Sequence, residues 1–202
     1  IIFFYLVTMA NYFIIFFNTQ NFIKLIFSVL IIATFFICIL RMDKDNFHIK
    51  ILILVFLVIS LGSPTFHSDA RIIWLFNAKR IFMDGNTYFL MDNEIGKLWF
   101  DTYPLLGPSV ASAIANIFGY WNEVFPKAFS VILSMPPLLY LNSIIDKKIN
   151  KIFFVLIVVF LLEKSLLMGE MDGLLALYFV VSAIISFQFI FTDNKNKFKK
   201  DP

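Results

Sequence analysis

Long apolar runs separated by short polar segments make up most of this chain. Six runs approach the length of a membrane-spanning helix, at residues 1–17, 22–40, 47–66, 128–145, 152–168 and 174–191. Such a helix needs about 20 mostly apolar residues, because the hydrocarbon core is about 30 Å thick and each residue rises about 1.5 Å. The third and fifth runs reach full length only if Lys50, Glu163 and Lys164 extend their charged ends to the interface. The pattern predicts an all-α, polytopic transmembrane bundle of six spans.

The fourth run contains two adjacent prolines, Pro136 and Pro137, near its middle. A proline inside a helix has no backbone N–H to donate, and its ring clashes with the preceding turn. We therefore expect a kink in the fourth span.

Basic residues are concentrated in the polar segments that follow the second, fourth and sixth runs. Three clusters hold ten of the 17 lysines and arginines: Arg41, Lys44 and Lys50; Lys147, Lys148 and Lys151; Lys195, Lys197, Lys199 and Lys200. Positive charge flanking membrane spans favours the cytoplasmic side. We therefore place the three clusters in the cytoplasm. Nine of the 14 acids then fall on the opposite side, namely Asp69, Asp84, Asp92, Glu94, Asp101, Glu123, Glu163, Glu170 and Asp172.

The longest polar segment, residues 67–103, separates the third run from the fourth, and any chemistry must sit there. Residues 69–83 within it have the periodicity of an amphipathic helix. The apolar face consists of Trp74, Leu75, Ala78, Ile81 and Phe82, with Arg71 falling on the same side. Asp69, Asn77 and Arg80 lie near one another on the other face. We expect a juxtamembrane helix that lies at the membrane interface.

A second short helix is expected over residues 104–120, which read PLLGPSVASAIANIFGY. If this stretch crossed the bilayer, the second and third basic clusters would be forced outside. It is also short and rich in Gly, Pro, Ser and Ala. We therefore expect an interfacial or re-entrant helix, and a single transmembrane domain that runs through four parts. These are three spans (1–66), an outer loop with two interfacial helices (67–124), three further spans (125–191) and a basic cytoplasmic tail (192–202).

Composition fixes the class of protein: 60% of the 202 residues are hydrophobic and the mean hydropathy is +0.84, as in an integral membrane protein. The single cysteine, Cys38, lies inside an apolar run, which excludes a disulfide framework and a cysteine-based metal site. There is no glycine-rich phosphate loop, nucleophile elbow or zinc-binding spacing. Basic residues cluster at membrane edges, so we expect no nucleic-acid partner. Because the chain opens at Ile1, already within an apolar run, we expect a fragment.

Several short motifs occur in an order that resembles a known family. Asp69, Ala70, Trp74, Ala78 and Lys79 stand in DARIIWLFNAK, Tyr103 and Pro104 in DTYPLLGP, Phe118 and Gly119 follow, and Asp172 with residues 174–177 stands in MDGLLAL. With an Asp at the start of the outer loop and two juxtamembrane helices, this resembles the N-terminal half of GT-C glycosyltransferases. That superfamily takes sugars from polyprenyl-phosphate carriers and includes protein mannosyltransferase and aminoarabinose transferase relatives. The likeness covers about residues 50–191.

The resemblance implies that Asp69 is the catalytic base, since the family's base is the first acid of this loop. Partial desolvation at a membrane boundary can raise the basicity of a carboxylate. Without the family, capping of the juxtamembrane helix is the favoured interpretation of Asp69. Arg71, Lys79 and Arg80 are candidates for binding the donor phosphate, Arg being suited to bidentate contact. Contact with lipid headgroups is the equally weighted alternative.

Candidate substrate-binding residues are His67, Trp74 and Tyr103, although Trp and Tyr more often anchor a chain at the interface. The segment HSD places His67 where some family members have an acid, which argues against a metal in the first loop. Glu170 and Asp172 are candidates for holding a divalent cation, Mg²⁺ or Mn²⁺, that neutralises the leaving phosphate. Distantly related oligosaccharyltransferases have an acidic pair in the comparable loop. Ordinary loop solvation is the alternative.

We therefore expect a membrane glycosyltransferase that transfers a sugar from a polyprenyl-phosphate donor to a lipid-linked, glycan or protein acceptor. Direct attack by the acceptor would invert the anomeric carbon, as the family implies. The expected location is a bacterial inner membrane with a periplasmic active face; a eukaryotic endoplasmic reticulum membrane has the equivalent topology. Two alternatives are a transporter or flippase of lipid-linked saccharides, and a non-catalytic membrane scaffold. The sequence shows no internal repeat of the kind that many transporters have.

Overall fold

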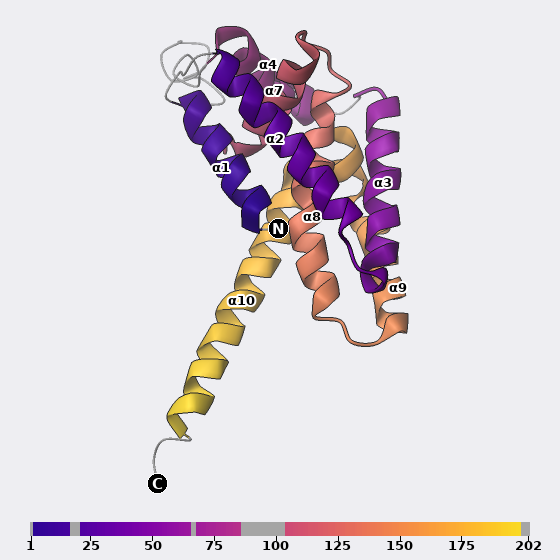
Figure 1. Ribbon diagram of the computed structural model, residues 1–202. Coiled ribbons are helices and arrows are strands. Elements are labelled where there is room, and N and C mark those ends of the chain that lie inside the picture. The colour runs from indigo at the N-terminus through magenta and orange to yellow at the C-terminus, as the bar shows by residue number, and fades with distance from the viewer. Residues whose placement is uncertain (1, 17–20, 66–67, 86–103, 199–202) are drawn as a thin grey trace.

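The computed structural model (Figure 1) describes residues 2–16, 21–65, 68–85 and 104–198 of the chain. Over these ranges the regular structure is helical throughout and contains no strand. The all-α prediction is confirmed for this part of the chain.

Six helices occupy the six apolar runs. They are α1 (Ile2–Phe16), α2 (Asn21–Leu40), α3 (Phe47–Gly62), α8 (Phe129–Ser143), α9 (Lys148–Met168) and α10 (Asp172–Phe198). Among the described residues, three segments are long and apolar enough to cross a membrane: Asn21–Leu40, Lys44–Gly62 and Asp172–Ile190. The chain thus has the spans of a multi-pass membrane protein. Crossing by α1, α8 and α9 remains a prediction.

The basic ends of the helices meet at one end of the bundle. The His48 Nε2 atom lies 2.7 Å from Asn142 Oδ1, and the Asn142 amide donates to Asn46 Oδ1 at 2.6 Å. These contacts join the end of α8 to Asn46 in the α2–α3 connection and to His48 in the first turn of α3. The first basic cluster lies in and just after that connection, and the second lies just after α8. Figure 1 shows α10 continuing away from the bundle toward the C-terminus. The first two basic clusters therefore lie on the same side, as the orientation argument requires.

Both helices expected in the outer loop, residues 67–124, are present. A π-helical turn, Ala70–Trp74, leads into α4 (Leu75–Asp84), and α7 spans Leu106–Phe118. Helix α7 has 13 residues, which rise about 20 Å and fall short of a hydrocarbon core about 30 Å thick. As expected, it is too short to cross a membrane on its own.

The location of α7 differs from a helix lying on a membrane surface. All nine residues from 107 to 115 are buried, and the helix packs against α1, α2, α4 and α8. An interfacial helix keeps one face exposed, so this burial argues against the interfacial alternative, and the re-entrant alternative stays a prediction. The many small residues of α7 are explained by close helix packing, which they permit.

Gly107 shows how closely α7 is packed. A Cβ atom at this position would lie 2.5 Å from Met171 Sδ and 2.8 Å from Phe129 Cε2. A side chain at this position fits between the start of α8 and the loop before α10 only if Met171 and Phe129 shift. The contact fixes α7 against the end of the bundle opposite the basic clusters.

Candidate functional site

The candidate site lies where α3 ends and α8 begins, at the end of the bundle opposite the basic clusters. Lys127 stands in a short 3₁₀ turn, Pro126–Ala128, and its side chain is fully buried. Its ammonium group donates to the Ser63 carbonyl oxygen and, at 3.1 Å, to Ser63 Oγ. Ser63 is the C-cap of α3, where the helix dipole favours a positive charge. Lys127 thus fixes the point from which the chain enters the polar segment.

Burial also changes the pKa of Lys127. Removing the ammonium group from water disfavours its charged form, so desolvation lowers the pKa of Lys127 below the ordinary value of 10.5. Lys127 lies just before the fourth expected span.

Glu123, near the end of the outer loop, contacts one residue just before the start of that loop and one just after it. Thr65 Oγ1 donates to the Glu123 carbonyl oxygen at 3.2 Å, and Arg71 Nε lies 3.2 Å from Glu123 Oε2. The Arg71 and Glu123 side chains are 55% and 48% exposed, so their ion pair contributes at most about 1 kcal/mol. The pair positions Arg71, and another anion can replace Glu123 as the partner of its guanidinium group.

Asp69 is exposed at the beginning of this helical segment. Its carboxylate makes no capping hydrogen bond to the backbone; Ser68 Oγ approaches Asp69 Oδ1 at 3.5 Å. The capping interpretation of Asp69 is therefore not supported. The π-helical turn begins at the next residue, and such turns are frequent at functional sites. The Asp69 carboxylate is therefore exposed at the surface of the protein.

The three candidate phosphate-binding cations lie on one helical segment but are not gathered at one point. Arg71 is near its start and is paired with Glu123, whereas Arg80 Nε lies 3.0 Å from Asp84 Oδ2. Lys79 is exposed. Arg71 is separated from Arg80 by nine residues, or roughly 13 Å of helical rise. Of the three, Arg71 lies nearest to Asp69 along the segment.

Two residues of this segment are buried rather than on a surface. Trp74 is 3% exposed and belongs to the core. The structure therefore supports neither substrate binding nor interfacial anchoring by its side chain. Asn77, expected on the polar face, is 0% exposed. Neither atom of its amide group has a hydrogen-bond partner among the described residues. Asn77 follows Trp74 by three positions and precedes Ile81 by four, so it belongs to the apolar stripe despite its polarity.

The acidic pair lies in the short turn between α9 and α10. Gly169 ends α9 with a left-handed φ of 79°, and a Cβ there would lie 3.0 Å from Lys127 Cγ. This contact places the turn beside Lys127. Glu170 is half-buried, with its Oε1 atom inside the protein, whereas Asp172 is exposed in the first turn of α10. An acid at a helix start is stabilised by the dipole, which favours a structural role for Asp172.

No group of three metal-ligating side chains occurs among the described residues. Glu170 and Asp172 alone provide two carboxylates, and the divalent cation stays a prediction. His67 and Tyr103, the other two candidate substrate-binding residues, lie outside the described residues.

Sequence reasoning missed Lys127, Ser63 and Glu123 as parts of this site. For Lys127 a signal was present, because it is an isolated cation on the side where flanking positive charge is disfavoured. Ser63 and Glu123 give no such signal, because their partners are 64 and 52 positions away in the chain.

The fold and the site define an all-α protein with three candidate membrane spans, a short buried helix and an exposed acidic residue at one end. Comparison of the chain with protein-family models, with characterised proteins and with solved structures gives no match.

Proposed function

We propose that this chain belongs to a GT-C-like membrane glycosyltransferase, which moves a sugar from a polyprenyl-phosphate donor to a lipid-linked, glycan or protein acceptor on the periplasmic face. The observation that carries the proposal is the carboxylate of Asp69. It is exposed, makes no helix cap and directly precedes a π-helical turn at the end of the bundle away from the basic clusters. These are properties of a group available to a substrate.

The proposed reaction is a single displacement at the anomeric carbon. Asp69 accepts the proton of the acceptor hydroxyl while that oxygen forms the new bond to the anomeric carbon. The bond from the anomeric carbon to the phosphate oxygen breaks, and the phosphate leaves with the electron pair. Attack from the face opposite the leaving group inverts the configuration.

Arg71 is the residue best placed to stabilise the departing phosphate. Its exposed pair with Glu123 is weak enough to be exchanged for a phosphate oxygen. Guanidinium suits this task because it presents two parallel donors to an oxyanion. Lys79 and Arg80 lie farther along the segment, where they can contact a diphosphate or a lipid headgroup.

The experiment compares sugar transfer in membranes that contain the full chain, with radiolabelled polyprenyl-phosphate sugars as donors. Asp69→Asn keeps the size of the side chain and removes the base, so transfer should fall by about 10²- to 10⁴-fold. Asp146→Asn is the matched control, an exposed acid at the opposite end of the bundle, and should transfer at the wild-type rate. Transfer that persists in Asp69→Asn would remove Asp69 from the mechanism. Absence of transfer by the wild type from every donor would overturn the proposed function.

A further inference from the structure

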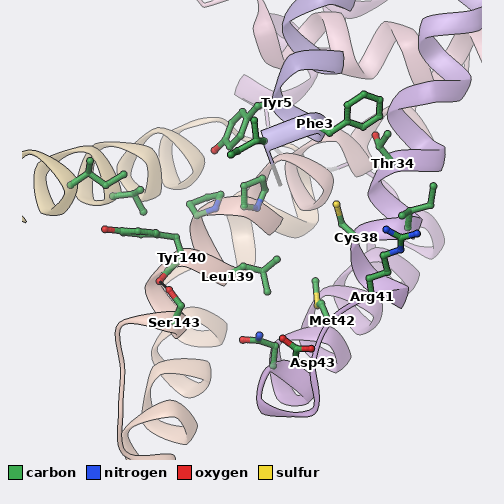
Figure 2. Close-up of a pocket in the computed structure, with 17 residues that line it drawn as sticks. Phe3, Tyr5, Thr34, Cys38, Arg41, Met42, Asp43, Leu139, Tyr140 and Ser143 are labelled. Atoms are coloured by element: carbon green, nitrogen blue, oxygen red, sulfur yellow. Dashed lines mark hydrogen bonds between the residues drawn. The ribbon is translucent and has the colours of Figure 1, made fainter.

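A cavity lies at the basic end of the bundle, away from Asp69. Figure 2 shows this cavity, which has a volume of about 810 Å³ and opens between α1, α2, α8 and α10. Its volume is within the range of about 300–1,000 Å³ that is common for ligand sites. The candidate site described above contributes none of its lining residues.

The body of the cavity is apolar. Phe3, Cys38, Leu139 and Val181 line it from four different helices, together with the rings of the two prolines of α8. Two of these helices, α2 and α10, contain candidate membrane spans, so the cavity lies at the depth of the hydrocarbon chains. Water gains little in such a lining, because it needs two to four polar partners. The walls suit a hydrocarbon chain.

The charged residues of the lining, Arg41 and Asp43, lie toward one end of the cavity, whereas Tyr5 and Thr34 lie toward the other (Figure 2). Arg41, Met42 and Asp43 lie together just beyond α2, across the cavity from Tyr140 and Ser143 of α8 (Figure 2). Arg41 is exposed, and no carboxylate of the described residues pairs with it. The Ser143 hydroxyl donates to the Tyr140 carbonyl oxygen at 2.7 Å. The cation at this end is therefore available to an anion from outside the chain.

The surroundings of this end are positively charged. Residues 41–50 contain three basic and two acidic residues, and residues 146–151 contain three basic and one acidic, which gives a net charge of +3 for the two segments. Among the described residues Asp43 is the one acid that lines the cavity, and it reduces this field without cancelling it. The polar end also lies on the side assigned to the cytoplasm, where the headgroups of the inner leaflet are anionic.

We propose that the cavity binds one anionic phospholipid of the inner leaflet. Its acyl chain occupies the apolar body between α2, α8 and α10, and its phosphate lies against the guanidinium group of Arg41. Charge complementarity at one end of the cavity favours an anionic lipid over a neutral one. The apolar lining at membrane depth favours an acyl chain over water. The site is separate from the proposed transfer chemistry and does not depend on it.

The first experiment measures lipid binding to the full chain in detergent by native mass spectrometry, with phosphatidylglycerol as the probe. The wild type should retain one phosphatidylglycerol. Arg41→Gln should weaken binding by about five- to tenfold, the loss expected for one cation near an anionic headgroup. Lys44→Gln is the matched control, because Lys44 is exposed in the same segment but does not line the cavity; its affinity should stay within about twofold. Equal binding by all three proteins would overturn the role of Arg41.

A second experiment needs no variant and is unaffected by folding defects. Cys38 is the single cysteine of the chain and lines the cavity, so alkylation by N-ethylmaleimide reports on this site alone. Phosphatidylglycerol should slow the alkylation of delipidated protein several-fold, and phosphatidylcholine should do so much less. Equal protection by both lipids would overturn the choice of an anionic headgroup. A thiol that reacts at the same rate with and without lipid, or is unreactive throughout because protein covers it, would overturn the site.

Discussion

The Tyr178 hydroxyl of α10 donates a hydrogen bond to the Leu133 carbonyl oxygen of α8 at 2.8 Å. In a regular helix that oxygen would accept from the N–H of the residue four positions later. Here that residue is Pro137, which has no N–H. A side chain from another helix thus supplies the donor that the proline removes, and couples α10 to the middle of α8. In an apolar interior an unpaired carbonyl would be costly.

We expect Tyr178→Phe to lower the free energy of unfolding by about 1–3 kcal/mol, because it leaves the Leu133 carbonyl oxygen buried and unpaired. In a Pro137→Ala background the backbone N–H is restored, so the same substitution should cost much less. Denaturation of the four proteins in detergent gives the coupling between the two positions. Tyr140→Phe is a control, since its hydroxyl bonds Gln188 Oε1 at an exposed site. Equal losses in both backgrounds would show that Pro137 is unrelated to the bond.

We expect Gly107→Ala to destabilise the protein by about 1–3 kcal/mol, the usual cost of overpacking. The added methyl group would overlap Met171 Sδ and the ring of Phe129. Met171→Ala should relieve part of this cost in the double variant, because it removes the nearer contact. Gly62→Ala is the matched control: nothing lies within 4 Å of its Cβ position, and alanine is the better helix former. Thermal unfolding of the variants makes the comparison, and a neutral Gly107→Ala would contradict the packing.

We expect stability to rise with pH through the titration of Lys127. Its folded-state pKa is lowered below 10.5 by burial, so between the folded and unfolded pKa values the unfolded chain binds more protons. Stability then increases with pH across that window, because the cost of burying the charge disappears as the amine deprotonates.

The measurement is the melting temperature of the wild type and of Lys127→Met from neutral pH to pH 10.5. The melting temperature of the wild type should rise relative to that of Lys127→Met as pH increases. Lys79→Met removes an exposed lysine from the same part of the molecule and serves as the control. Parallel curves for wild type and Lys127→Met would refute a depressed pKa.

The six long helices were predictable because the length of an apolar run is a property of the sequence alone. The prediction that the first two basic clusters share one side also agrees with the structure, since Asn142 joins the two connections that hold them. Both arguments use only local composition and the thickness of a bilayer.

Burial within the polar segment could not be predicted in the same way. Asn77 and Trp74 belong to one stripe, and whether that stripe faces lipid, water or protein depends on where α7 lies. The small residues of α7 are compatible with an interfacial helix as well as with a packed one; only its neighbours decide. Lys127 likewise gains its partner, Ser63, from a distance of 64 positions.

The exposed pair between Arg71 and Glu123 leads to a prediction about donor binding, which rests on the proposed function. If Arg71 must leave Glu123 to contact the donor phosphate, Glu123→Gln should release it and lower the KM for the polyprenyl-phosphate sugar. The expected change is at most about fivefold, because an exposed pair is worth up to about 1 kcal/mol. Arg71→Gln should raise KM and lower kcat, since the charge acts on the leaving phosphate. Steady-state transfer rates at varied donor concentration give both constants.

The double variant should behave like Arg71→Gln alone, because Glu123 then has no arginine to hold. An increase of KM in Glu123→Gln as large as in Arg71→Gln would instead make the pair a structural clamp, whose loss disorders the segment that presents Asp69.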